Sequence, residues 1–255
     1  MTKYFSWTAI LLGGCCIMAV TALPPIRIQL GPDQNICGIT EPEIRLNPNS
    51  KKKLGLIIWL HGGMRSSNHE KGAEAHRAIL PFIDANKYYL ASPSAFGGQD
   101  WLTPQGLAHI DTLIHYMLGH YPIDPADINM VGVSDGTLGT IAYSLNGHYS
   151  LHRRILISCF PQIVLPMEQI QSPGLASLKT GSWDFFQGGH DRLFPIDQVL
   201  PFLQTWEKNY PNVHVHYFPE GEHDFSFYAE YAQAELKKLL IPVTKASKKI
   251  VKVFR

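Results

Sequence analysis

A serine lies between two glycines in the segment Gly132-Val133-Ser134-Asp135-Gly136, where an apolar run that predicts a strand meets a run that predicts a helix. Such a strand-to-helix turn presents the serine hydroxyl above the edge of a sheet, where it can act as a nucleophile. Side chains in place of the two glycines would collide with the neighbouring strand or helix. A serine that merely caps a helix would produce the same local pattern, so residues elsewhere in the chain must decide between the two interpretations.

A nucleophilic serine needs a base, and the base needs an acid that orients it. His223 follows the last expected strand of the chain, and Asp191 follows the strand before it. A carboxylate in that place holds the histidine in the required tautomer and stabilises its charged form. Asp184 falls inside an expected strand and Asp197 at an expected helix start, so both are weaker candidates for the acid.

Acyl transfer by a serine also needs donors for the oxyanion that forms at the substrate carbonyl. The segment His61-Gly62-Gly63 directly follows an expected strand, and its glycines let the backbone come close to a substrate. The expected donors are the backbone N–H groups of Asp135, next to the serine, and of a residue in the pair Gly63 and Met64. Two such donors stabilise the transition state by several kcal/mol.

The hydrophobic pattern of the sequence predicts the strands and helices that position these residues. Short aliphatic or β-branched runs alternate with longer stretches of helical periodicity, which is typical of a parallel sheet with crossover helices. Strands are expected over residues 54–60, 88–93, 128–133, 154–159, 183–186 and 213–218, and helices over 70–86, 105–119, up to 146, 197–208 and 224–240. Nearly continuous apolar strands indicate that both faces of the sheet are covered. We therefore predict a three-layer α/β sandwich with a mostly parallel central sheet, in one domain over residues 23–241.

The order of the candidate residues along the chain, Ser134, Asp191 and then His223, is the order found in α/β hydrolases. Over residues 54–240 the sequence resembles that superfamily. Within it the sequence is similar to small esterases related to polyhydroxybutyrate depolymerases, feruloyl esterases, dienelactone hydrolases and the phospholipase/carboxylesterase group. The segments that carry the resemblance are 59–63, 121–127, 132–136, 189–195 and 221–225. One departure is Thr137, where many of these families have a second glycine, and we expect it to alter the elbow or the packing of the helix on its strand.

The resemblance implies a serine carboxylic-ester hydrolase that works through an acyl-enzyme intermediate. Ser134 would be the nucleophile, His223 the base and then the acid, and Asp191 the residue that orients His223. No metal ion or organic cofactor is implied, and the substrate would be a small-molecule or polymeric ester. Two other functions fit the same residues: a peptidase resembling the catalytic domain of the prolyl oligopeptidase group, and a hydrolase fold that binds a ligand without catalysis.

The surroundings of the site are expected to be open. The segment 160–182 has room only for a small cap, so a minimal lid or none is predicted. Trp101, Phe194 and Phe225, together with Phe96, fall in loops expected at the same edge of the sheet and are candidates for contact with the substrate. Large aromatic side chains also fill protein cores, which is the alternative for each of them.

Composition excludes several other classes of protein. The chain carries 22 basic and 21 acidic side chains, a formal net charge of +1, which argues against nucleic-acid binding. Hydrophobic residues make up 45% and charged residues 17% of the sequence, so the chain is expected to fold rather than remain disordered. His214 and His216 share one face of an expected strand but have no evident third ligand, so no metal site is predicted.

The first 22 residues predict export from the cytoplasm. They hold an apolar stretch after Lys3 and end in Val20-Thr21-Ala22 ahead of a break, which fits a signal peptide cleaved after Ala22. The alternatives are a lipoprotein processing site at Cys15 and an uncleaved membrane anchor. All three place the rest of the chain in the periplasm, in the cell envelope or outside the cell.

Outside that segment the chain has two cysteines, Cys37 and Cys159. In an oxidising compartment they can form a disulfide, and the alternative is that each is a small buried side chain. Cys159 lies in an apolar run, which favours burial. Residues 242–255 form a basic tail, most simply a solvated terminus.

Overall fold

The computed structural model describes residues 25–30, 36–42, 51–63, 67–95, 100–171 and 179–240. The predicted export segment, the candidate oxyanion donor Met64, the candidate pocket residue Phe96 and the basic tail lie outside the described residues. In the described part of the chain, no helix is long and apolar enough to cross a membrane.

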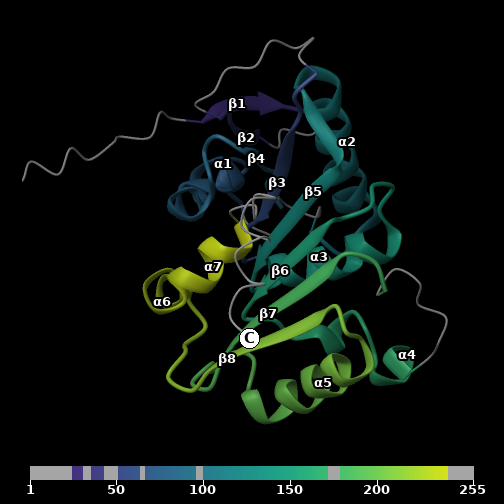
Figure 1. Cartoon of the computed structure of the whole chain (residues 1–255), viewed down its shortest axis with the longest axis vertical. Coiled ribbons are helices and arrows are strands. Elements are labelled where there is room, and N and C mark those ends of the chain that lie inside the picture. The colour runs from purple at the N-terminus through teal and green to yellow at the C-terminus, as the bar shows by residue number, and fades with distance from the viewer. Residues whose placement is uncertain are drawn as a thin grey trace, which may run out of the picture.

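One eight-stranded sheet runs through the described residues, in the strand order β1-β2-β4-β3-β5-β6-β7-β8 (Figure 1). Strands β3 to β8 pair in parallel, whereas β1 and β2 form an antiparallel edge. The strands are β1 (Ile26–Gln29), β2 (Ile36–Thr40), β3 (Leu54–Leu60), β4 (Tyr88–Ser92), β5 (Ile123–Val133), β6 (Arg153–Ile157), β7 (Ser182–Gly188) and β8 (Val213–Phe218). Every residue of β3 and β4 is buried, as expected for strands covered on both faces.

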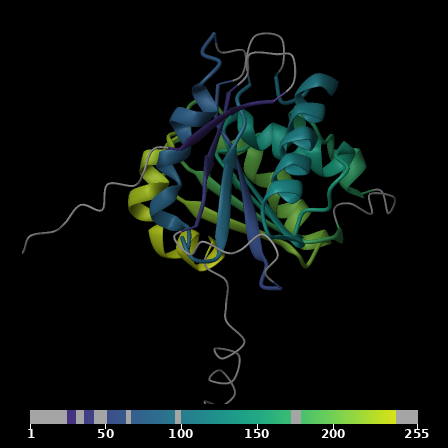
Figure 2. The ribbon, with the colours of Figure 1, turned by 90° about the horizontal axis from the view of Figure 1, so that it is seen from above.

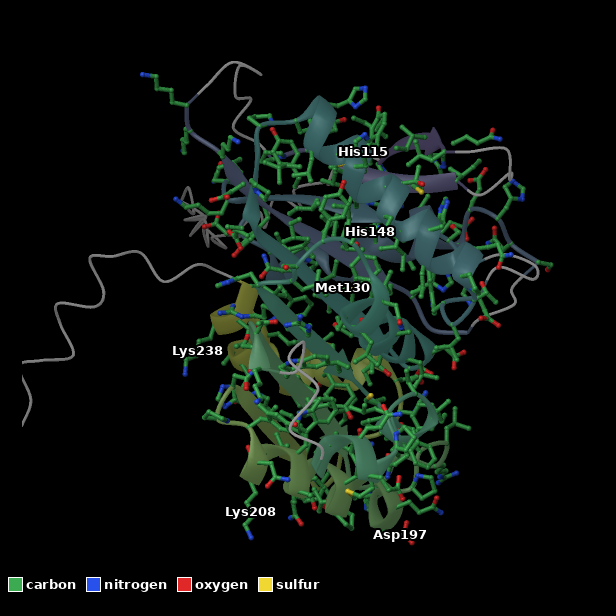
Figure 3. All side chains as sticks on the ribbon, turned by 90° about the vertical axis from the view of Figure 1, so that its right-hand side faces the viewer. His115, Met130, His148, Asp197, Lys208 and Lys238 are labelled. Carbon is green, nitrogen blue, oxygen red and sulfur yellow. The ribbon has the colours of Figure 1, made fainter. Side chains whose placement is uncertain are left out.

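Helices cover both faces of this sheet, which confirms the predicted three-layer α/β sandwich (Figure 2). Helices α2, α3, α4 and α5 pack on one face, and α1, α6 and α7 pack on the other. Met130 of β5 lies inside the molecule, whereas Asp197 and Lys208 of α5 point outward (Figure 3). The helices are α1 (Lys71–Ala75), α2 (Pro104–His120), α3 (Asp135–Asn146), α4 (Met167–Gln171), α5 (Ile196–Asn209), α6 (Phe225–Tyr231) and α7 (Gln233–Leu240).

Four parts of the fold differ from the sequence predictions: the edge strands β1 and β2, the segment 70–86, the segment 224–240 and strand β5. The hydrophobic pattern predicts neither β1 nor β2. Strand β1 is short, largely exposed and without a continuous apolar run. The helix expected over 70–86 is a short α1 followed by two 3-10 turns, because Pro81 lacks the N–H that a continuing helix needs. The helix expected over 224–240 is divided at Ala232 into α6 and α7, and both halves bury side chains in the same core cluster.

Strand β5 is longer than the expected 128–133 because its first half bulges. Leu54 of β3 pairs with Ile123, whereas Leu56 pairs with Ile128, so the residues between them in β5 have no regular partners. Pro125 lies in this irregular part, where the missing N–H breaks no ladder hydrogen bond. The regular half of β5 then runs through the centre of the sheet and ends at the candidate serine.

Candidate active site

Ser134 lies at the sharp turn between β5 and α3, with φ 52° and ψ −121°. Its side chain makes no helix-capping hydrogen bond, so the helix-cap interpretation of the motif is wrong. A Cβ on Gly132 would overlap the carbonyl oxygen of Gly136, and a Cβ on Gly136 would overlap the carbonyl oxygen of Leu60. The turn can form because neither glycine carries a side chain. The strained turn directs the hydroxyl of Ser134 away from the helix.

The hydroxyl of Ser134 contacts His223, and His223 in turn contacts Asp191, as the sequence predicts. Its Oγ lies 2.8 Å from Nε2 of His223, in the loop between β8 and α6. The other ring nitrogen, Nδ1, lies 2.9 Å from both carboxylate oxygens of Asp191, in the loop after β7. With Asp191 ionised, Nδ1 carries the ring proton, so Nε2 accepts the hydrogen bond from Ser134.

Asp191 is buried, and its carboxylate receives a fixed set of donors. The backbone N–H groups of Leu193 and Phe194 donate to its Oδ1, at 3.0 and 2.8 Å. The amide of Gln187 lies 3.4 Å from Oδ2, and its Oε1 accepts from the N–H of Cys159 at 3.1 Å. These contacts supply the hydrogen bonds that a buried carboxylate needs and fix its orientation toward His223.

Ser158, at the end of β6, holds the loop that carries the histidine. It is fully buried, and its Oγ donates to the carbonyl oxygen of His223 at 2.9 Å. Its backbone is in the left-handed region, with φ 55°, although it is not a glycine. Ser158 and Gln187 are not among the site residues that the sequence predicts. Each stands in or beside an apolar strand run, where no motif distinguishes it.

The candidate oxyanion donors lie on both sides of Ser134. Asp135 is the first residue of α3, and the first N–H groups of a helix have no acceptor within the helix. On the other side, Gly63 has φ 70°, and its carbonyl oxygen accepts from Nζ of Lys71 at 2.9 Å. A Cβ on Gly62 would lie 3.1 Å from Cβ of Ser134, so this loop passes close to the nucleophile.

No family model matches the chain, and no curated protein is similar to it in sequence. Solved structures are similar in fold. S-formylglutathione hydrolase from Staphylococcus aureus has a TM-score of 0.66 at 14% identity, over 85% of this chain and 98% of that one. Est1E from Butyrivibrio proteoclasticus has a TM-score of 0.61 at 16% identity, over 90% of this chain and 100% of that one.

Two further structures are described as an esterase and as a serine hydrolase. The fluorophosphonate-binding serine hydrolase F of Staphylococcus aureus has a TM-score of 0.62 at 15% identity, over 86% of this chain and 100% of that one. A thermostable esterase has the same TM-score and identity, and the match covers 86% of this chain but only 61% of that one. The chain has the α/β-hydrolase fold. Its eight-stranded, mostly parallel sheet with helices on both faces is the architecture that these structures share with it.

His61 anchors the loop after β3, which carries the candidate oxyanion donor Gly63. Its Nδ1–H donates to the carbonyl oxygen of Gly62 at 2.8 Å, and its Nε2 accepts from the N–H of Ala95 at 3.1 Å. Burial lowers the pKa of His61 to about 4, so the ring is neutral at neutral pH. The ring therefore joins the loop after β3 to the segment after β4.

Thr137, which departs from the glycine of many α/β hydrolases, fits within the elbow. It is fully buried, and its Oγ1 donates to the carbonyl oxygen of Ser134 at 2.6 Å. Cys159 lies beside it and shares a side-chain hydrogen bond with it. Cys159 and Cys37 are both free and buried, so the structure contains no disulfide between them. Burial raises the pKa of both thiols.

The three predicted substrate-contact residues lie in different places. Trp101 is only 1% exposed and donates from Nε1 to the carbonyl oxygen of His61 at 3.1 Å, so it is a core residue that packs under the loop after β3 and not part of an open pocket. Phe225 packs edge-on against Trp59, with ring centroids 5.1 Å apart, and belongs to the edge of the core. Phe194 lies beside the candidate base, with its ring centroid 4.9 Å from that of His223.

Of the two histidines on β8, His214 is exposed and His216 is held by contacts within the fold. His216 stacks on Phe186 and lies 3.3 Å from the buried carboxylate of Asp184. Among the described residues, no group of three His, Cys, Asp or Glu side chains is arranged to hold a metal ion.

Proposed function

We propose that this α/β hydrolase is a serine carboxylic-ester hydrolase in which Ser134, His223 and Asp191 form the catalytic triad. The observation that carries the proposal is the continuous chain of contacts from Ser134 Oγ to His223 Nε2 at 2.8 Å and from His223 Nδ1 to Asp191 at 2.9 Å. Solved structures of the same fold that are described as an esterase and as a serine hydrolase support it. The apolar segment that ends at Ala22 supports the further proposal that the enzyme acts after export.

In the acylation step, His223 takes the proton of Ser134 through Nε2 while Oγ attacks the carbonyl carbon of the ester. The carbonyl oxygen becomes an oxyanion, which the N–H groups of Asp135 and of Gly63 or Met64 stabilise. His223 then gives its proton to the alcohol oxygen as the carbon–oxygen bond breaks. The alcohol leaves, and the acyl group remains on Ser134 as an ester.

In the deacylation step, a water molecule occupies the place of the alcohol. His223 removes one proton from this water as its oxygen attacks the acyl carbon, and then returns the proton to Ser134 as the acyl bond breaks. Asp191 stays ionised throughout and stabilises the charged His223. One water is consumed, and one carboxylic acid and one alcohol are released.

The direct test replaces the nucleophile. Ser134→Ala is expected to lower kcat for p-nitrophenyl acetate by at least about 10⁴-fold without unfolding the protein, because no acyl-enzyme can form. Ser150→Ala is the matched control, since Ser150 is exposed in the turn between α3 and β6, and it should retain wild-type turnover. Initial rates and circular dichroism spectra of the three proteins measure both effects.

Three results of this test would contradict the proposal. Ser134→Ala with wild-type turnover would exclude the serine as nucleophile. Turnover of a peptide p-nitroanilide without turnover of any ester would indicate a peptidase. A folded wild-type protein that cleaves neither substrate would indicate a binding protein on a hydrolase fold.

A further inference from the structure

Two segments that are far apart in the sequence meet near His223 through the rings of Phe194 and Phe160, and each segment carries an exposed apolar side chain. Leu193 and Phe194 come from the loop after β7, and Phe160 and Ile163 come from the segment after β6. Leu193 is 67% exposed and is the most exposed large apolar side chain in the described part of the chain, and Ile163 is 52% exposed. We call these four residues the apolar wall.

Contacts connect the apolar wall to the candidate base. The ring centroid of Phe194 lies 4.9 Å from that of His223 and 5.7 Å from that of Phe160. Ile163 closes the 3-10 turn that begins at Pro161, and its N–H donates to the carbonyl oxygen of Phe160 at 3.2 Å. Phe194 therefore joins His223 to Phe160, and the two exposed residues of the wall, Leu193 and Ile163, lie one and three residues along the chain from these rings.

Hydrogen bonds fix the backbone of both segments that carry the apolar wall. The backbone N–H groups of Leu193 and Phe194 both donate to Asp191, so the acid of the triad also fixes the loop that presents the two side chains. On the other segment, the amide of Gln162 donates to the carbonyl oxygen of Gln198 in α5 at 2.7 Å. A side chain displayed from an anchored backbone loses little further freedom when a ligand covers it.

The proton transfers in the proposed mechanism determine whether the acyl group or the alcohol group of an ester lies against the apolar wall. The tetrahedral carbon is bonded to Ser134 Oγ, and its oxyanion faces the N–H groups near Asp135 and Gly63. The alcohol oxygen must lie within hydrogen-bond reach of His223 Nε2, because it receives its proton there. The alcohol group therefore leaves on the side of His223, where Phe194 begins the wall.

We propose that the apolar wall binds the alcohol group of the substrate, and that the preferred substrates are esters of apolar alcohols such as aryl, benzyl or longer alkyl alcohols. This inference rests on the proposed ester hydrolase function and names its substrate class. Covering Leu193 and Ile163 with an apolar group removes their exposed surface from water, which favours such alcohols over ethanol. The acyl group points elsewhere and makes no use of the wall.

The test varies the alcohol and the acyl group separately in the full chain. One series holds the acyl group as acetate and compares ethyl, butyl and benzyl esters, and the other holds p-nitrophenol and compares acetate, butyrate and octanoate. The wild-type enzyme is expected to prefer benzyl over ethyl acetate. Leu193→Ser and Ile163→Ser should each lower that preference, in kcat/KM and mainly through KM, by up to about tenfold.

A matched substitution controls for general effects on the fold. Ile26 is 45% exposed on β1, at the opposite edge of the sheet from β7 and β8 (Figure 1). Ile26→Ser should leave both series unchanged. The wall variants should likewise leave the dependence on acyl length unchanged, because every ester in that series has the same alcohol.

The inference is wrong if the wild-type enzyme shows no preference among the alcohols. It is also wrong if Leu193→Ser and Ile163→Ser change the dependence on acyl length instead, or if Ile26→Ser has the same effect as the wall variants. In each of these cases esters are still cleaved and the proposed function stands. If the wild-type chain cleaves no ester, the proposed function fails and the inference fails with it.

Discussion

Two serines at the site adopt a backbone conformation that residues other than glycine rarely adopt. Ser134 has φ 52° and Ser158 has φ 55°, and no other non-glycine residue in the described ranges has a positive φ. Such strain costs of order 1–3 kcal/mol at each residue and persists only where the surrounding structure enforces it. Both serines contact His223, one through its ring and the other through its backbone carbonyl oxygen. The strain is thus concentrated at the two serines that contact His223.

We predict that Ser158 is a positioning residue for His223. Ser158→Ala should lower kcat about fivefold with little change in KM, because a hydrogen bond of about 1 kcal/mol to the histidine loop is lost. Ser158→Gly should lower kcat equally but should unfold at a higher urea concentration than Ser158→Ala, because glycine tolerates the positive φ. Steady-state kinetics and urea titration of both variants provide the comparison.

A purely structural role for Ser158 would give a different pattern. In that case kcat would stay at the wild-type value in both variants and only the urea midpoint would move. A rise in KM with unchanged kcat would also exclude the positioning role, since His223 acts in the chemical step.

At the scale of the elements, the loops at the carboxyl ends of the strands are joined to one another by hydrogen bonds. His61 joins the loop after β3 to the segment after β4. Gln187 joins the end of β7 to Cys159 after β6, and His190 donates from its N–H to the carbonyl oxygen of Gly221 after β8, at 2.8 Å. The loops that carry the site are therefore braced against each other.

This bracing makes the stability of the fold depend on pH. Burial lowers the pKa of His61 from 6.5 to about 4, and burial also lowers the pKa of His76. Below pH 6.5 these two histidines therefore bind more protons in the unfolded chain than in the folded chain. The free energy of unfolding should fall as the pH decreases from about 6.5 toward 4, with His61 contributing roughly 3 kcal/mol of this loss.

Urea unfolding at pH 7, 6, 5 and 4 measures this loss. His61→Asn should be less stable than the wild type at pH 7 but should lose less stability on acidification, because Asn does not titrate. The exposed His214 provides the control, and His214→Asn should follow the wild-type curve. Parallel curves for the wild type and His61→Asn would contradict the assignment.

The hydrophobic pattern of each strand and helix explains which of them could be predicted from the sequence. Strands β3, β4, β6 and β8 are recognisable because each is an apolar or β-branched run bounded by polar or turn residues. Strand β1 is not, because its side chains are largely exposed and only pairing with β2 defines it. The break at Ala232 also has no local signal, since it depends on how α6 and α7 both reach the core.

At the scale of the whole molecule, the parallel sheet brings distant residues to one edge. Ser134, Ser158, Asp191 and His223 follow β5, β6, β7 and β8 at their carboxyl ends, which meet at that edge. Ser134, Asp191 and His223 could be predicted from motif position and chain order. Ser158 could not, because its role depends on a contact with a residue in a loop far along the chain.

The wrong placement of Trp101 has the same origin. An aromatic residue in a loop near the site can face either the substrate or the core, and sequence spacing does not distinguish the two. Here the close approach of Gly139 in α3, where a Cβ would lie 2.6 Å from Cβ of Trp101, lets the indole pack inward. Phe194 packs on Phe160 and lies beside His223 instead.

The most direct test of Ser134 as an activated nucleophile is covalent labelling of the full chain with a small fluorophosphonate probe, followed by peptide mapping. We predict one labelled residue, Ser134, with no label after heat denaturation and much slower labelling of Asp191→Asn, because only the assembled triad activates the hydroxyl. A folded chain that takes up no label, or takes it up at another serine, would contradict the assignment of Ser134 as an activated nucleophile.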